Sequence, residues 1–123
     1  MKSVDLSKLS VDRLLERFIE LGLAEDAARD QDNLKLYNRL YAEVEAVDKE
    51  LRSRGREARL ILTRLYDHPN IQVRLQAAQF SYGVAPEAAR RCLQAIADSK
   101  IPPQYLDAGM SLGLLDEGLS KLD

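Results

Sequence analysis

Apolar side chains recur every three or four residues along each long segment of this 123-residue chain, and this helical period constrains the fold more than any other feature. The clearest stripe lies within residues 34–51. It comprises Tyr37, Leu40, Val44, Val47 and Leu51, and it is widened by Leu34 and Tyr41. No segment alternates apolar and polar residues convincingly, as a half-buried strand would. The sequence therefore predicts an all-α protein.

Capping residues, glycines and prolines divide the chain into about six helices. Ser10 carries a side chain that caps helix N-termini, so a first helix is expected directly after it. Gly22 either ends this helix or lies inside it, and Gly55 ends the second helix. Four shorter helices are expected at residues 58–65, 71–80, 86–96 and 102–118. Because the connections are short, the helices are expected to form antiparallel pairs, the unit of an α-solenoid.

The last two helices are also expected to bury one face each. These faces comprise Ala89, Cys92, Leu93 and Ile96 in the fifth helix, and Leu106, Met110, Gly113 and Leu114 in the last. Gly109 and Gly113 are four residues apart, and small residues at this spacing predict close packing of the last helix against a neighbour.

The composition excludes several classes of protein. One Cys excludes an internal disulfide, and one Cys with one His excludes a Cys/His zinc site within the chain. No apolar run approaches the roughly 20 residues of a membrane span, and the first residues do not resemble a signal peptide. At this length one domain is the default. We therefore expect a single cytoplasmic helical-repeat domain over residues 1–123 that contacts no membrane.

One segment, residues 65–78, resembles a HEAT repeat. The matching positions are Asp67, Pro69, Val73, Arg74 and Ala78. The resemblance implies two helices joined by a turn. It also implies that Asp67 accepts backbone N–H bonds at the start of the second helix and that Arg74 bonds a neighbouring turn.

A wider resemblance covers nearly the whole chain. The residues that carry it are Asn38-Arg39-Leu40, Ala46-Val47, Glu50-Leu51, the run from His68 to Ala78, Ala85-Pro86 and Asp107-Ala108-Gly109-Met110. In these the chain is similar to a small bacterial family of unknown function, about 120 residues long, with a HEAT-like α-α superhelix. The resemblance implies this fold, a short α-solenoid, and assigns no activity.

No set of residues indicates catalysis, a cofactor or a bound metal. His68 is the lone histidine, in a turn without an orienting partner, and Cys92 lies on an apolar face. We therefore expect that the protein is not an enzyme and has no cofactor. Carboxylates gather in two places, but their spacing is not that of a calcium loop, and solvated helix faces are expected instead. They are Glu25, Asp26, Asp30 and Asp32, and Glu43, Glu45, Asp48 and Glu50.

Positive charge is concentrated in the middle of the chain. Residues 52–100 carry 9 basic and 4 acidic side chains, although the net charge of the chain is -2. The basic excess begins around Gly55, where the arginines are interpreted either as a solvated helix end or as a contact surface for a partner. The candidate partner-binding residues are Arg52, Arg54, Arg56, Arg59 and Arg74, followed by Tyr41 and Tyr82.

These patterns favour a non-catalytic protein-protein interaction module with an unidentified protein partner. One variant of this reading is an immunity or antitoxin-type inhibitor. An alternative is binding of a nucleic-acid backbone through an Arg-rich face. Its candidates are Arg52, Arg54, Arg56, Arg59, Arg64, Arg74, Arg90 and Arg91. A homodimer is a further possibility if the apolar stripe of the second helix is wider than the other helices of the same chain can cover. Tyr37 and Tyr41 are interpreted as core residues between the first two helices rather than exposed anchors.

Overall fold

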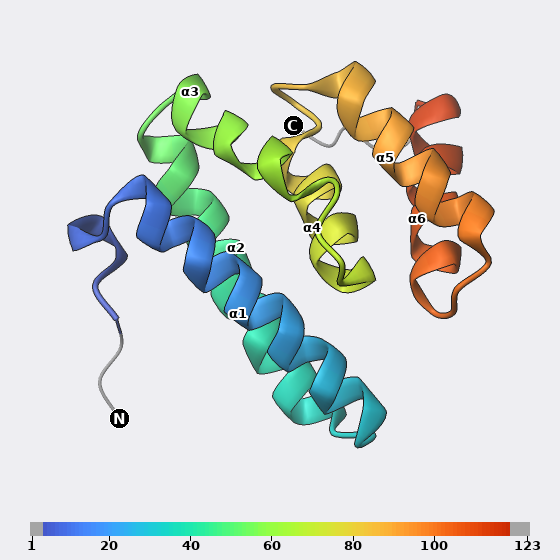
Figure 1. Ribbon diagram of the computed structural model, residues 1–123, viewed down its shortest axis with the longest axis horizontal. Helices are drawn as coiled ribbons and strands as arrows, with labels where there is room; N and C mark the ends of the chain where they lie inside the picture. Colours follow the sequence, from blue (N-terminus) through green and yellow to red (C-terminus); the bar gives the residue numbers. More distant parts are fainter. Residues whose placement is uncertain (1–3, 119–123) are drawn as a thin grey trace. The chain divides into compact units, whose positions relative to one another are not determined.

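The computed structural model describes residues 4–118, and every regular element in this range is a helix (Figure 1). The described part of the chain forms six α-helices and two short 3-10 helices. In chain order they are η1 (Leu6–Lys8), α1 (Val11–Asp30), α2 (Leu34–Ser53), α3 (Arg56–Arg59), η2 (Leu60–Leu65), α4 (Ile71–Ser81), α5 (Pro86–Ser99) and α6 (Gln104–Asp116). The all-α prediction is confirmed.

The chain divides into two compact units, Met1–Ile61 and Leu62–Asp123. The first unit contains η1, α1, α2 and α3, and the second contains α4, α5 and α6, with η2 at the boundary. The expectation of one domain over residues 1–123 stays a prediction.

Helices α1 and α2 lie side by side and antiparallel in the first unit (Figure 1). The hydroxyl of Ser10 accepts the backbone N–H of Arg13 at 3.1 Å, so the predicted N-cap is confirmed. Gly22 is buried inside α1 rather than at its end. The helix ends at a tight turn, where Asp32 has a positive φ of 53° and the side chain of Asn33 caps α2.

Apolar side chains from both helices form the core of the first unit. They are Leu14, Phe18, Leu21 and Ala28 from α1, and Val44, Val47 and Leu51 from α2. The stripe predicted for α2 is therefore largely correct. Leu34 is the exception, because it lies at the start of α2 and is exposed.

The third predicted helix changes its winding. It begins as one turn of α-helix, α3, and continues as the 3-10 helix η2. Gly55 precedes it with a φ of 103°, a conformation in which a side chain is strained, and α2 has ended two residues earlier. The predicted stop at Gly55 is thus confirmed.

The second unit is built on α5, which packs against both α4 and α6. Its core includes residues from all three helices. They are Leu75, Ala78, Ala89, Cys92, Leu93, Ile96, Ala108 and Leu112. The predicted face of α5 is confirmed. Helix α4 is buried on several sides, with Gln72 and Gln76 buried beside its apolar residues.

The predicted face of α6 is wrong. The residues that α6 buries are Gln104, Ala108 and Leu112. Leu106, Met110 and Leu114, which were expected to be buried, are 56%, 65% and 37% exposed. Close packing at the glycines is also wrong, because a Cβ built on Gly109 or Gly113 meets no atom within 4 Å.

Candidate functional site

The arginines that follow α2 are partly occupied by contacts within the first unit. Arg52 donates from Nε to a carboxylate oxygen of Asp48 at 2.7 Å. Arg54 donates from Nε to Glu50 at 2.9 Å, and its Nη2 reaches the backbone carbonyl of Leu6 at 2.9 Å. Arg54 thereby ties η1 to the end of α2, which is a structural role within the unit.

Arg56 and Arg59 differ in exposure. Arg56 is exposed on α3. Arg59 is half-buried and its charge acts on the Asp48 carboxyl. Of the arginines around Gly55, Arg56 is therefore the side chain most open to a partner.

The two carboxylate groups expected on solvated faces each contain a buried member, and this corrects the sequence interpretation. Glu25 of α1 is 0% exposed and Asp48 of α2 is 7% exposed. Burial raises the pKa of Asp48, although the hydrogen bond and charge of Arg52 act in the opposite direction. The spacing of the apolar residues did not indicate that these two carboxylates are buried.

The tyrosines of α2 were interpreted from the sequence as core residues, but Tyr37 and Tyr41 are only partly buried and lie outside the buried core. The Tyr37 hydroxyl accepts from Nη2 of Arg29 at 2.8 Å, and the guanidinium carbon of Arg29 lies 4.7 Å from the Tyr37 ring centroid. Tyr41 is half-buried. Burial raises its pKa, and the nearby carboxyl of Glu45 adds to this. Tyr41 is thus partly held within the first unit rather than displayed in full.

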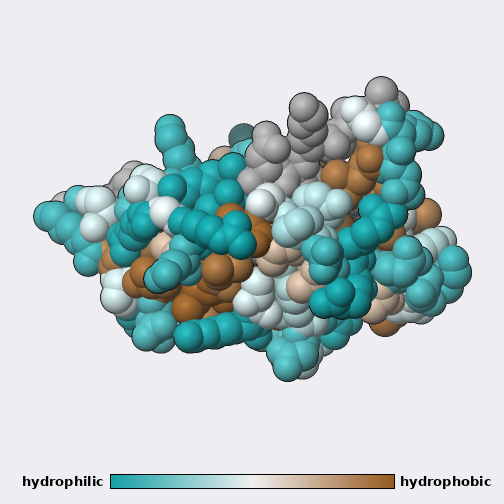
Figure 2. Space-filling model, turned by 90° about the horizontal axis from the view of Figure 1, so that it is seen from above, coloured by the Kyte–Doolittle hydropathy of each residue, from teal (hydrophilic) through white to brown (hydrophobic). Residues whose placement is uncertain are grey.

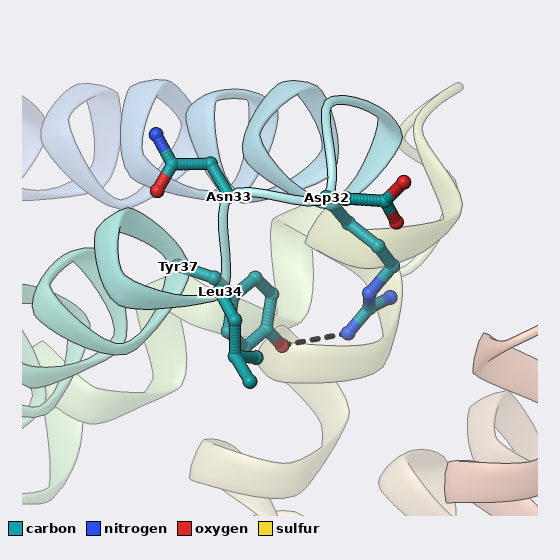
Figure 3. A pocket seen from close by; sticks show the side chains of 5 residues that line it. Asp32, Asn33, Leu34 and Tyr37 are labelled. Carbon is teal, nitrogen blue, oxygen red and sulfur yellow. Dashed lines mark hydrogen bonds between the residues drawn. The ribbon is translucent and has the colours of Figure 1, made fainter.

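A shallow pocket of about 330 Å³ lies at the turn between α1 and α2 (Figure 3). It is lined by Arg29, Asp32, Asn33, Leu34 and Tyr37. The oxygen of the Asn33 side chain already caps α2, and Arg29 is bonded to Tyr37. The pocket is therefore lined by one cation, Arg29, and one anion, Asp32. Two of its polar side chains, Arg29 and Asn33, already form hydrogen bonds within the first unit.

The turn before α4 departs in one detail from the HEAT resemblance. The N-cap of α4 is Asn70, whose side-chain oxygen accepts the N–H of Val73 at 3.0 Å, rather than Asp67. The expected bond from Arg74 is present, because its Nη1 donates to the His68 carbonyl at 3.1 Å. Arg74 therefore stabilises the turn.

The lone histidine and the lone cysteine are both engaged in the second unit. The Nδ1 atom of His68 accepts the backbone N–H of Asn70 at 3.0 Å. Cys92 is buried, and burial raises the pKa of its thiol, which keeps the sulfur protonated. Tyr82, the remaining candidate contact residue, is partly buried against the core of this unit.

The exposed face of α6 is the feature that sequence reasoning missed. Leu106, Met110 and Leu114 are four residues apart and so follow one side of the helix, with Gly109 and Gly113 beside them. The helix contains Asp107 and Asp116 but no Lys or Arg. We call the five residues Leu106, Gly109, Met110, Gly113 and Leu114 the α6 apolar face. The sequence signal for the side that α6 does bury was the spacing of Ala108 and Leu112, which are also four residues apart.

Hydrophobic side chains reach the surface in patches between hydrophilic ones on the side of the molecule that Figure 2 shows (brown and teal). Among the helices of residues 4–118, none combines the length and the hydropathy that a membrane-spanning segment requires. The same range contains no group of three or more His, Cys, Asp or Glu side chains arranged to hold a metal ion.

Comparison with known proteins places the chain in a family. A protein of known structure, given as the protein RPA1889 from Rhodopseudomonas palustris CGA009, is 39% identical and superposes with a TM-score of 0.93. The match covers 97% of this chain and 98% of that one. No curated protein matches the chain. Residues 12–116 match the family described as Domain of unknown function (DUF2019), and the chain belongs to this family.

Proposed function

We propose that this protein is a non-catalytic protein-protein interaction module of the HEAT-like type and that the α6 apolar face is its contact surface. The observation that carries the proposal is the exposure of Leu106, Met110 and Leu114 in one row. Three large apolar side chains on one side of a helix cost free energy in water, and a partner that covers them removes that cost. The cytoplasmic location and bacterial origin expected from the sequence stay predictions.

The state of the reactive side chains supports a role without catalysis. A general base needs a free lone pair near a substrate, but Nδ1 of His68 is used by a backbone N–H. A cysteine nucleophile needs a lowered thiol pKa, whereas burial raises that of Cys92. Both side chains thus act within the fold.

Nucleic-acid binding is the weaker alternative, because internal contacts reduce the free positive charge. At least four of the eight candidate arginines are bonded within their own unit. They are Arg52, Arg54, Arg74 and Arg90, bonded to Asp48, Glu50, the His68 carbonyl and Asp116 respectively. A phosphate-binding surface would also give duplex affinity that falls steeply with salt. Absence of duplex binding at low salt would reject this alternative.

The test compares partner capture by three forms of the tagged full-length chain in lysate of the source organism. Wild type, Leu106→Lys/Met110→Lys and the control Leu34→Lys are purified in parallel, and their bound proteins are identified by mass spectrometry. Leu34 is also an exposed leucine, on α2, so its change matches the test variant in chemistry. We expect a protein that wild type and Leu34→Lys retain and that the α6 variant loses at unchanged thermal stability.

The arginine hypothesis is tested separately through Arg56. Arg56→Glu changes an exposed charge, whereas Arg54→Glu also breaks the bonds that hold η1. Loss of the same captured protein with Arg56→Glu at unchanged melting temperature would extend the contact surface to the first unit. Capture that is equal for all variants would contradict the proposed function of α6.

A further inference from the structure

The α6 apolar face has a symmetric order of residues. Leu106 and Leu114 lie four residues before and four residues after Met110, so the row reads the same in both directions. A two-fold axis through Met110 and perpendicular to the helix therefore places Leu106 of one copy beside Leu114 of another. We infer that the partner of this face is a second copy of the same chain, bound with the two α6 helices antiparallel. This inference rests on the proposed function of the α6 apolar face.

The backbone of α6 leaves room for a second helix at this face. Gly109 and Gly113 are exposed, and a Cβ at either position would meet no atom within 4 Å. Glycines spaced by four residues lower the surface of a helix and allow another helix to approach closely. The leucine and methionine side chains of one copy thus fill the depressions above the glycines of the other.

Charge at the two ends of α6 selects the antiparallel direction. Lys100 is exposed just before the helix, and its ammonium lies 5.6 Å from the centroid of the Tyr105 ring. Glu117 is exposed at the C-cap. Antiparallel pairing brings Lys100 of one copy to the end that carries Glu117 of the other, whereas parallel pairing brings like charges together. The helix dipoles favour the same direction.

The size of the face predicts a weak dimer. A helix of 13 residues is about 20 Å long, and one side of it offers less than the roughly 800 Å² per partner of a standard stable interface. The dimer is therefore expected to dissociate on dilution. Self-association at high concentration is the property that the test must detect.

The first measurement is sedimentation equilibrium over a wide range of protein concentration. Wild type and the control Leu34→Lys are expected to rise from monomer toward dimer mass as concentration increases. Met110→Lys places a charge at the two-fold axis, and its association should be at least about tenfold weaker. A wild-type chain that stays monomeric at every concentration overturns the inference. If Leu106→Lys/Met110→Lys then still loses a captured protein, the proposed function stands while the second copy is rejected.

The second measurement tests the direction of pairing by cross-linking. Leu106→Cys and Leu114→Cys are treated with a short bismaleimide, each alone and as a mixture, with wild type as the control for buried Cys92. Antiparallel pairing predicts that the mixture gives several times more cross-linked dimer than either variant alone. Equal yields from the single variants and the mixture would indicate unspecific contact, and higher yields from the single variants would indicate parallel pairing. Either result would overturn the inference.

A charge exchange provides an independent check on the ends of the helix. Lys100→Glu should weaken association by about 2–5-fold, the effect of one exposed ion pair at each end. The double variant Lys100→Glu/Glu117→Lys should restore it, because the opposite charges meet again. Failure of the double variant to recover association would contradict the antiparallel arrangement.

Discussion

Two carboxylates of the first unit, Glu25 of α1 and Asp48 of α2, are buried beside the apolar core that α1 and α2 form. Spacing identified Val44, Val47 and Leu51 as core, because apolar side chains repeat with the helix. The same reasoning placed Glu25 and Asp48 in water, yet both are buried. Burial of a carboxylate depends on the groups from other parts of the chain that pack over it, and one-dimensional spacing does not report them.

Asp48 should make the stability of the protein depend on pH. Its pKa is raised above the ordinary value of 3.8, mainly by burial, so the folded chain holds this proton to higher pH than the unfolded chain. The resulting contribution to the free energy of unfolding is complete below pH 3.8 and is lost as pH rises through the raised pKa. We expect Asp48→Asn to lack this fall.

Urea unfolding of wild type and Asp48→Asn at a series of pH values from below 4 to 7 measures the difference directly. The free energy of unfolding of wild type minus that of Asp48→Asn should decrease with rising pH across the lower part of this range and then level off. Two parallel curves would show that Asp48 has the same pKa in the folded and unfolded chain.

The turn before α4 gives a second prediction at the scale of single residues. Asn70 caps the helix with its side chain, so Asn70→Ala should lower the free energy of unfolding by about 1 kcal/mol. Asp67 is exposed three residues earlier, and Asp67→Ala should change the free energy of unfolding by less than about 0.5 kcal/mol. The comparison uses thermal or urea unfolding followed by circular dichroism. A larger loss for Asp67→Ala would restore the cap role that the HEAT resemblance implied.

At the scale of the element, helix existence was predictable and helix orientation was not. Pro86 opens α5 and Gly55 follows α2 as expected, because these residues act on the local backbone. For α6 the apolar residues occupy more than one side, so the sequence offers two registers. The structure buries Ala108 and Leu112 because α6 packs against α5 with that side, a choice made by the neighbouring helix.

Two positions on α6 test this register. Leu112 is buried in the core of the second unit, so Leu112→Ala should lower the free energy of unfolding by about 2–5 kcal/mol. Met110 is 65% exposed, and Met110→Ala should change stability by less than about 0.5 kcal/mol. Both are measured by urea unfolding at a concentration low enough to exclude self-association. The reverse order would show that α6 buries the side first predicted from its sequence.

At the scale of the whole molecule, the length of the chain predicts one domain, and the structure contains two compact units. Each unit has a core of its own, with Phe18 in the first and Leu93 in the second. A unit of about 60 residues buries a smaller share of its surface than a domain twice as long and is marginally stable alone. We therefore expect the two units to unfold together.

Hydrogen exchange measured by mass spectrometry on the intact chain tests this coupling. Leu14→Ala removes core packing in α1, and Leu93→Ala does so in α5. With one cooperative domain, either variant lowers amide protection in both halves of the chain. Loss of protection confined to the half that carries the change would show two independent domains and contradict the expectation of one.

The sequence by itself determined that the protein is all-α, where most helices begin and end, and which side α2 and α5 bury. These properties follow from local backbone preferences and from apolar spacing along a single helix. Only the tertiary structure decided that Glu25 and Asp48 are buried and that α6 exposes Leu106 and Met110. Each of these depends on which groups from distant parts of the chain lie within a few ångströms, and that proximity exists only after the helices have packed.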